Sequence, residues 1–474
     1  MKRRQFVATT ALGLGYLAFR PFSVFSVELT WVSRRPPLTE RRFTSKSVEA
    51  TIQTIKKAIK DPELAWMFEN CYPNTLDTTV KFNIKEGKPD TFVITGDIDA
   101  MWLRDSSAQV WPYLPLVPND PELQQLFVGL IHRQMQCIRF DPYANAFNDG
   151  PTGSYWETDL TEMKPELHER KWEIDSLCYP VRLSYHYWKT SKDATPFDSV
   201  WLETAKLIVK TLIEQQRKHD KGPYSFMRIS EKPTDTLAGN GFGSPIKPNG
   251  LICSAFRPSD DATTFLFLVP SNFFAVVSLR QMAEMSRALF NDSAFAVQCE
   301  SLALEVEEAL NDFAVSSHPV MGKVYAFEVD GFGNRLFMDD ANVPSLLSLP
   351  YLGAVSSHDK VYQNTRKLLL STHNPWFFEG EAASGIGGPH VGEEMIWPMS
   401  IIMQAMTSED EEEIKRCIGW LKHTHAGTGF MHETFHKDDP TRFTRSWFAW
   451  ANTLFGELML HLYHEYPHLL EQQY

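Results

Sequence analysis

The sequence predicts an all-α fold in which two concentric layers of helices close into a ring, a toroidal α/α barrel formed by a single domain. Helical periodicity recurs along nearly the whole chain, and helices with one apolar face alternate with helices that are apolar nearly all round. No fixed-period repeat, low-complexity tract or change in composition marks a second domain. A pair of helical domains is the alternative that these patterns leave open.

The outer layer is predicted from helices with a single apolar stripe. Apolar residues spaced three and four positions apart form such stripes at 48–59, 123–130, 202–212 and 414–421. Asp120, followed by a proline, is typical of a helix start, as is Asp198 or Ser199 before the third stripe. Ser408 and Glu411 have capping-box spacing, which predicts that the fourth helix is capped by Ser408.

The inner layer is predicted from three segments that are apolar nearly all round, at 273–279, 395–406 and 447–460. Helices of this kind are buried on most sides. About a dozen helices of ordinary length fit between residues 48 and 463. Strand signals are scarce, and the best of them lie at 91–95 and 323–329.

The first residues have the pattern of an export signal. A basic start at 2–4 is followed by an uncharged, largely apolar run at 6–19, which is too short to span a membrane. Residues 1–27 are therefore predicted to direct export to the periplasm by a Sec or twin-arginine-like route. Residues 28–44 are proline- and arginine-containing and are predicted to form a linker, with the barrel domain at 45–474.

Charge and composition exclude several classes of protein. The 474 residues include 46 basic and 59 acidic side chains, for a net charge of −13, and no basic stripe is visible, so a nucleic-acid partner is not expected. No later segment is apolar enough for stable membrane insertion. The six cysteines show no metal-ligand spacing and are expected to be buried free thiols. We expect a monomer without cofactors.

Several segments between the predicted helices combine carboxylates with aromatic or cationic side chains. They lie at 96–105, 155–159, 171–175, 256–261, 338–342, 388–394 and 429–433. Carboxylates accept hydrogen bonds from sugar hydroxyls, and aromatic rings cover the apolar face of a pyranose. An aspartate before a helix can also serve only as a cap, as Asp260 or Asp261 could. So many such segments favour a shared sugar site at one rim, where two carboxylates could hydrolyse a glycosidic bond.

One motif competes with this interpretation. Residues 432–436 read His-Glu-Thr-Phe-His and fit the zinc-protease pattern, in which both histidines project from one helix face. Glycines before it and a proline soon after leave barely one turn of helix, which disfavours a zinc site. The sequence contains no phosphate-binding loop and no G-x-S-x-G elbow. A zinc-dependent hydrolase and a non-catalytic glycan-binding barrel remain the alternatives.

The chain resembles the bacterial exo-acting α-1,6-mannosidases of glycoside hydrolase family 125. The resemblance covers nearly all of residues 45–474 and rests on the motifs TGDIDAMWLRDS at 95–106, RPSDD at 257–261 and GTGFMHE at 427–433. It implies an (α/α)6 barrel, inversion of configuration and no metal requirement. The implied activity is release of the terminal, non-reducing mannose from α-mannoside oligosaccharides of N-glycans or mannan.

The resemblance also implies roles for residues at matching positions. Asp260 resembles the general acid and Glu433 the general base, with Asp261 as the alternative acid if the match slips by one residue. A helix that follows Asp260 would lower the pKa of this carboxyl. A general acid must hold its proton near neutral pH, so we expect burial and the neighbouring Asp261 to raise the pKa of Asp260 instead. Arg104 and Asp105 resemble ligands of the mannose hydroxyls. The same pocket is expected to include Asp99, Trp102, Arg257, Asp261, Asn342, His390, His432 and Trp447.

Overall fold

A computed structural model describes residues 31–474 of the protein. Ser33–Tyr474 form one compact unit, and every helix of the described chain belongs to it, so the alternative of two helical domains is wrong. Residues 1–27, predicted to be the export segment, lie outside the described residues. Within the described residues, no helix is both long enough and apolar enough to cross a membrane.

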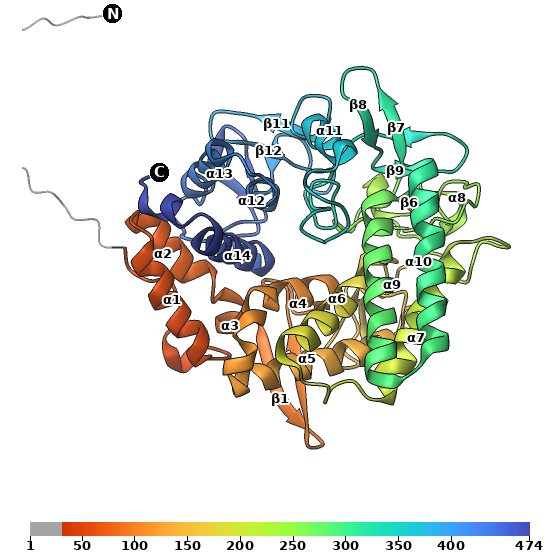
Figure 1. The fold of residues 1–474 in the computed structure, drawn as a ribbon, viewed down its shortest axis with the longest axis horizontal. Coiled ribbons are helices and arrows are strands. Elements are labelled where there is room, and N and C mark those ends of the chain that lie inside the picture. Colours follow the sequence, from red (N-terminus) through yellow and green to blue (C-terminus); the bar gives the residue numbers. More distant parts are fainter. Residues whose placement is uncertain (1–30) are drawn as a thin grey trace, which may run out of the picture. The chain divides into compact units, whose positions relative to one another are not determined.

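Helices are the main secondary structure of this unit. In Figure 1 they follow one another around a ring in sequence order, so that the last helix packs beside the first two. Residues 31–474 contain fourteen α-helices: α1 (Lys46–Ala58), α2 (Pro62–Cys71), α3 (Asn74–Thr78), α4 (Leu103–Val110), α5 (Pro121–Phe140), α6 (Ile174–Ser191), α7 (Ser199–Gln215), α8 (Ala238–Gly241), α9 (Val269–Phe290), α10 (Ser293–Phe313), α11 (Lys360–Leu369), α12 (Pro398–Met406), α13 (Glu411–His423) and α14 (Ala449–Glu465).

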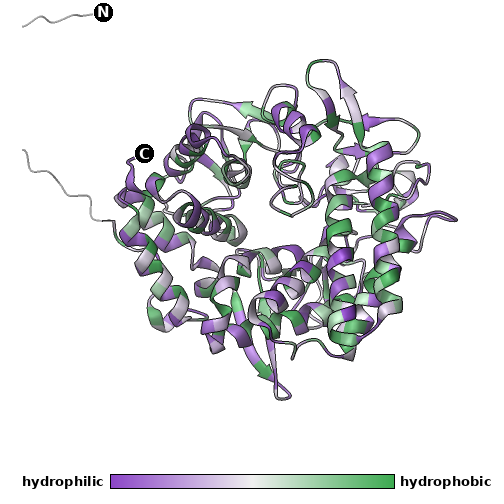
Figure 2. Cartoon of the chain, viewed as in Figure 1, coloured by the Kyte–Doolittle hydropathy of each residue, from purple (hydrophilic) through white to green (hydrophobic). Residues whose placement is uncertain are grey.

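The helices are of the two predicted kinds. α4 and α12 are buried almost throughout, and α6, α9 and α14 are buried on most sides, whereas α1, α11 and α13 bury one face. The buried helices pack on one another: α14 contacts α4 and α12, α4 contacts α6, and α6 contacts α9. Figure 2 shows hydrophilic and hydrophobic residues alternating along α10 and α13, as expected for helices with one face in solvent.

Two of the three predicted helix starts are confirmed. Asp120 caps α5 by accepting a hydrogen bond from Leu123 N at 3.0 Å, and Asp198 caps α7 in the same way. The capping box at Ser408 is wrong, because Asp410 accepts the bond from Glu412 N at 3.0 Å and so caps α13. The predicted inner helices at 395–406 and 447–460 begin later than expected, at the first residues of α12 and α14.

Short strands are more numerous than the sequence predicted. The segments predicted at 91–95 and 323–329 overlap β2 (Lys88–Val93), β8 (Gly322–Tyr325) and β9 (Glu328–Val329). The other strands are mostly too short to show a period of two. Residues 31–474 contain six small antiparallel sheets, built from β1 (Val80–Lys85) and β2 (Lys88–Val93); β3 (Met101–Trp102), β4 (Ala146–Phe147) and β5 (Leu167–Glu169); β6 (Phe267–Leu268), β9 (Glu328–Val329) and β10 (Arg335–Leu336); β7 (Val315–His318) and β8 (Gly322–Tyr325); β11 (Phe377–Glu379) and β12 (Ser384–Ile386); and β13 (Met395–Ile396), β14 (Thr434–His436) and β15 (Asp439–Thr444).

The segment ahead of α1 is fixed to the helices and is not a free linker from residue 33 onward. The Arg35 guanidinium donates to Asp77 Oδ2 on α3 at 2.7 Å and to Glu49 Oε2 on α1 at 3.0 Å. Arg41 donates to Glu49 Oε1 at 3.0 Å. The Arg35 and Asp77 side chains are buried, so the folded domain begins at Ser33 rather than at the predicted residue 45.

The cysteines are also as predicted. All six are buried and unpaired: Cys71, Cys137, Cys178, Cys253, Cys299 and Cys417. Burial raises the pKa of the Cys137, Cys253 and Cys299 thiols to about 12, so these side chains stay uncharged and act as small apolar core residues.

Candidate active site

The seven carboxylate-rich segments meet at one cavity of about 340 Å³. Each segment supplies at least one residue to its wall, so the expectation of a shared site holds geometrically. In chain order, representatives of the seven are Arg104, Trp156, Lys171, Asp260, Asn342, His390 and Glu433. Most other lining residues are aromatic or charged, which gives the cavity ring faces and hydrogen-bonding groups side by side.

The inner helices point their N-terminal ends at this cavity. Trp102, Trp397 and Phe448 are the residues immediately before α4, α12 and α14, and all three line it. Glu173, immediately before α6, lies behind the wall, bonded to the lining residue Arg104. A helix N-terminal end stabilises negative charge. The N-terminal ends of these helices therefore stabilise ionised carboxylates at this end of the barrel.

Two of the small sheets build opposite parts of the wall. The sheet β3–β4–β5 carries Trp102 on its first strand and His168 and Glu169 on its last. The sheet β13–β14–β15 is joined directly to Glu433, which precedes β14, and to Arg445, which follows β15. Residues that are distant in the sequence are therefore fixed beside the inner helices by strands of two to six residues.

Asp260 lies in a turn with a left-handed backbone, at φ +66°. Its N–H donates to Arg257 O at 2.9 Å, and α9 begins only at Val269, so the expected position directly before a helix is wrong. A non-glycine residue rarely takes this conformation, and such strain concentrates at functional sites. The turn separates two neighbouring carboxylates: Asp260 lines the cavity, and Asp261 is buried beside it.

Arg104 gathers three carboxylates around one buried guanidinium. Its Nη1 donates to Glu173 Oε2 at 2.5 Å and to Asp175 Oδ2 at 3.2 Å, and its Nη2 donates to Asp260 Oδ1 at 3.1 Å. The Asn145 amide donates to both Glu173 Oε1 and Asp260 Oδ1 at 3.3 Å. Glu173 and Asp260 are thus held together by shared donors.

These contacts shift the pKa values of the two acids in opposite directions. Burial raises the pKa of Asp260, but the nearby charges of Arg104 and Lys171 and a hydrogen bond from Glu173 outweigh it, so the pKa is lowered overall. Burial raises the pKa of Glu173 well above its ordinary value, and the charge of Asp260 raises it further. The pKa of Asp260 is thus lowered and that of Glu173 raised, which corrects the expectation that the pKa of Asp260 would be raised.

Glu433 occupies a separate part of the wall. Its Oε2 accepts a hydrogen bond from Thr444 Oγ1 at 2.9 Å, and its Oε1 accepts one from Arg445 Nη1 at 3.3 Å. His390 lies near both acids: burial lowers the pKa of its imidazole, but Asp261, Asp260 and Glu433 outweigh burial and raise it. Asp260 and Glu433 thus both influence His390. Asp260 is paired with Arg104, whereas Glu433 is paired with Arg445.

A scan against protein families matches residues 61–460 to metal-independent α-mannosidases of family GH125. The chain belongs to glycoside hydrolase family 125. It is 44% identical over 458 residues to the Meiotically up-regulated gene 157 protein of Schizosaccharomyces pombe, covering 93% of this chain and 90% of that protein. It is also similar to a Streptococcus pneumoniae metal-independent α-mannosidase solved as a non-productive substrate complex with α-1,6-mannobiose, with a TM-score of 0.85, 43% identity and coverage of 89% of this chain and 99% of that one.

A more distant likeness concerns the fold alone. A bacterial glucoamylase complexed with acarbose superimposes with a TM-score of 0.53 at 12% identity, covering 90% of this chain and 58% of that one. Together with the closer match to the streptococcal family 125 enzyme, this agrees with the α/α barrel predicted from the sequence.

The predicted periplasmic location is wrong. The fission-yeast relative, 44% identical over nearly the whole chain, comes from a eukaryote, and a eukaryotic cell has no periplasm. Membership of family 125 is therefore not evidence for a bacterial, periplasmic enzyme, and a basic start followed by an apolar run at 2–19 is too weak a signal to fix the location.

The zinc-protease interpretation of residues 432–436 is also wrong. Thr434–His436 form strand β14, so the two histidines do not share a helix face. His432 stacks on Phe443 with ring centroids 3.7 Å apart, and His436 Nε2 lies 3.3 Å from Glu394. Within residues 31–474, no three His, Cys, Asp or Glu side chains are grouped as a metal site would require.

Seven of the predicted site residues line the cavity and five do not. Asp99 is exposed and pairs with Lys81 at 2.6 Å, and Arg257 is buried and donates to Glu328 at 2.7 Å. The remaining three also lie off the wall. Asp261 is buried beside His390, and His432 stacks on Phe443. Trp447 lines a separate pocket. The seven that line it are Arg104, Asp105, Trp102, Asn342, His390, Asp260 and Glu433.

Several residues of the site had no role predicted from the sequence. Three of them lie in the carboxylate-rich segments 155–159 and 171–175: Trp156, Lys171 and Glu173. The sequence of these segments does not distinguish a catalytic acid from a helix cap. Others are isolated in the sequence and are brought to the cavity only by folding: His168, Glu169, Arg228, Trp397, Arg445, Phe448 and Trp450.

Proposed function

We propose that this protein is an exo-acting, inverting α-1,6-mannosidase that releases terminal non-reducing mannose from α-mannoside oligosaccharides, with Asp260 as general acid and Glu433 as general base. The observation that carries the proposal is that these two carboxylates line one cavity from separate loops, each with its own cationic partner. The complex of the streptococcal relative with α-1,6-mannobiose supports the linkage.

The cavity suits a single terminal sugar. A volume of about 340 Å³ is near the lower end of small-ligand sites, which favours a chain end over the interior of a glycan. Within the described residues, two buried indole N–H donors at the cavity have no hydrogen-bond partner and no ion-pair partner: Trp102 Nε1 and Trp397 Nε1. In the proposal these donors, with Arg104, Asp105 and Asn342, bind the mannose hydroxyls.

The acid step draws on the proton shared by Glu173 and Asp260. The Glu173 carboxyl transfers its proton to the Asp260 carboxylate, and Asp260 then donates it to the glycosidic oxygen as the bond to the anomeric carbon breaks. Asp260 is the donor because it lines the cavity, whereas Glu173 is fully buried behind it. Arg104, bonded to both, stabilises the negative charge left on the pair.

The base step takes place at Glu433. Its carboxylate removes one proton from a water molecule whose oxygen bonds to the anomeric carbon on the face opposite the leaving group. This single displacement converts an α-mannoside into β-mannose. The cycle closes when Glu433 releases its proton to solvent and the Glu173–Asp260 pair regains one.

The test is incubation with α-1,6-mannobiose in the presence of EDTA, followed by NMR of the newly released sugar. We expect hydrolysis, with the β-anomer of mannose appearing first. An α-anomer as the first product would indicate a covalent intermediate, and intact mannobiose would refute the assigned activity. Activity that EDTA abolishes and added zinc or calcium restores would contradict a metal-independent mechanism.

A further inference from the structure

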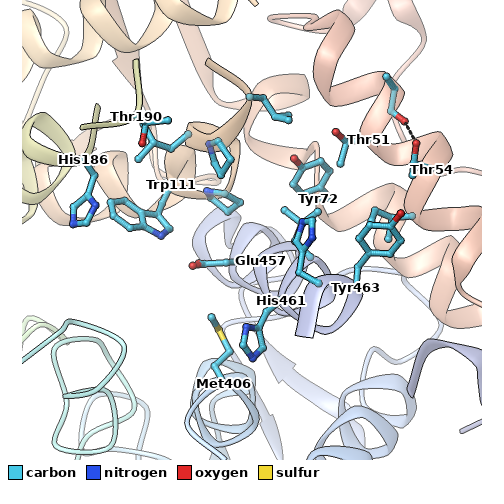
Figure 3. A pocket seen from close by; sticks show the side chains of 18 residues that line it. Thr51, Thr54, Tyr72, Trp111, His186, Thr190, Met406, Glu457, His461 and Tyr463 are labelled. Carbon is cyan, nitrogen blue, oxygen red and sulfur yellow. Dashed lines mark hydrogen bonds between the residues drawn. The ribbon is translucent and has the colours of Figure 1, made fainter. Parts of the chain in front are cut away.

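The structure contains a second cavity, of about 610 Å³ (Figure 3). It shares no lining residue with the catalytic cavity. Trp111 directly follows α4, Met406 is the last residue of α12, and His186 and His461 lie near the ends of α6 and α14. The same four helices that direct their N-terminal ends at the proposed active site therefore direct their C-terminal ends at this cavity.

The walls of the second cavity are mainly apolar and aromatic. Trp111, which follows α4, and Tyr463 of α14 are aromatic residues that line it (Figure 3). Thr51 and Thr54 of α1 also line it, but their hydroxyls donate to the carbonyls of Ser47 and Ala50 in their own helix. Tyr72 is buried, and within the described residues its hydroxyl has no hydrogen-bond partner. A ligand here would meet ring faces and few hydrogen-bond donors.

One carboxylate lies among these rings. Glu457 extends from α14 toward Trp111 (Figure 3), and its Oε2 accepts a hydrogen bond from Tyr351 at 3.0 Å. Within residues 31–474 no ion pair joins Glu457 to a basic side chain. Burial raises the pKa of Glu457 to about 7, although Arg182, Tyr351 and Trp111 lower it. The carboxylate is therefore only partly compensated by the protein.

Arg182 offsets the charge of Glu457 in part, but within residues 31–474 no ion pair joins these two side chains. Arg182 of α6 is held between two rings, 3.5 Å from Trp111 and 4.7 Å from Tyr351. Burial, and then Arg182 and Lys189, lower the pKa of His186 to about 4, so this imidazole is neutral near pH 7. The pKa of His461 on α14 is also lowered, chiefly by burial. His464 lines the cavity one turn further along α14.

We propose that this cavity binds an organic ammonium ion with an apolar body of about one ring, its nitrogen at Glu457 and its body against the ring of Trp111. The C-terminal ends of four helices favour a positive charge at this place. Aromatic faces beside a carboxylate are the surroundings that attract an alkylammonium group. The cavity volume lies within the range of small-molecule sites.

The probe is benzylammonium, with benzyl alcohol and benzoate as uncharged and anionic analogues. Saturation-transfer NMR and calorimetry with the full chain should show binding of benzylammonium, and at least about ten-fold weaker binding of the two analogues. Affinity should rise from pH 6 to pH 8, because Glu457 ionises over this interval while benzylammonium stays charged. Glu457→Gln should weaken benzylammonium to the level of benzyl alcohol.

Two further variants locate the bound probe. Thr54→Trp, on the exposed side of α1, should narrow the cavity and weaken binding while leaving Glu457 in place; it also decides the question if Glu457→Gln does not fold. Asp260→Asn should leave binding unchanged. Equal affinity for benzylammonium and benzyl alcohol, no binding of benzylammonium, or loss of binding in Asp260→Asn alone would overturn the proposal. None of these measurements depends on mannosidase activity.

Discussion

Replacing Glu173 by Gln tests whether the buried carboxyl pair supplies the catalytic proton. Gln keeps the size of the side chain and can still donate to Asp260, but it has no proton to transfer. Arg104 and Lys171 then keep Asp260 ionised, since both lower the pKa of this acid. The variant therefore loses general acid catalysis without losing the residue that delivers the proton.

The expected loss follows from the role of the acid. General acid catalysis contributes about 10²–10⁴-fold in rate, so kcat on α-1,6-mannobiose should fall by that factor. An aryl α-mannoside with an acidic phenol needs little protonation of its leaving group and should lose much less. The alkaline limb of the pH–kcat profile should move to lower pH, because the proton is held by the raised pKa of Glu173 in the wild type and only by the lowered pKa of Asp260 in the variant.

Asp175→Asn is the matched control. Asp175 is equally buried and accepts from the same Arg104 Nη1 at 3.2 Å, but Glu173 and Asp260 keep their shared proton in this variant. It should reduce activity on both substrates to a similar degree and move the alkaline limb much less than Glu173→Gln does, because the charge of Asp175 is only one contribution to the raised pKa of Glu173. If Glu173→Gln also lowers both substrates equally with an unmoved limb, Glu173 only positions Arg104 and the proton-sharing argument is refuted.

Three other changes have defined outcomes. Glu433→Gln should lower kcat on mannobiose and on the aryl mannoside together, by about 10²–10⁴-fold, because both need an activated water; a loss confined to mannobiose would contradict its role as base. His390 has a raised pKa, so its stabilising contribution is complete below pH 6.5 and disappears as the pH rises through the folded pKa. Urea unfolding should therefore show a larger stability difference between wild type and His390→Gln at pH 5.5 than at pH 8.5, and the opposite order would contradict the sign. Gly96→Ala should cost about 1–3 kcal/mol of unfolding free energy, because a Cβ at φ +130° collides with the Trp447 carbonyl, whereas Gly87→Ala, with open space around it, should show only the cost of its left-handed φ.

The helical layers could be predicted because burial leaves a periodic record in the sequence. Stripes of three and four residues marked the outer helices, and segments apolar on all sides marked α9, α12 and α14. Strands of two or three residues are too short for any period, so the sheets that support the site were missed. The start of α13 was misplaced because Ser408 and Asp410 are both good caps, and only the backbone geometry decides between them.

The composition of the site was easier to predict than the direction of its side chains. Asp260 and Asp261 are neighbours with the same chemistry, yet the left-handed backbone at Asp260 sends them to different surroundings. Arg257 and His432 also contact residues away from the cavity, although their neighbours Pro258 and Glu433 line it. The lowered pKa of Asp260 depends mainly on Arg104, whose position no local pattern of residues specifies.

The arginines ahead of α1 determine where the protein can be shortened. A chain starting at Ser45 would retain every residue of the proposed active site, but it would lack Arg35 and Arg41. Asp77, whose pKa is raised by burial even beside Arg35, would then be a buried carboxylate without its counter-ions. Breaking a buried ion pair in this way costs about 3–5 kcal/mol, a large share of the roughly 5–15 kcal/mol that keeps a domain folded. A recombinant protein cut at the predicted domain boundary would thus be less stable, and proteolysis that removes the segment before Ser45 would destabilise the enzyme without touching its proposed active site.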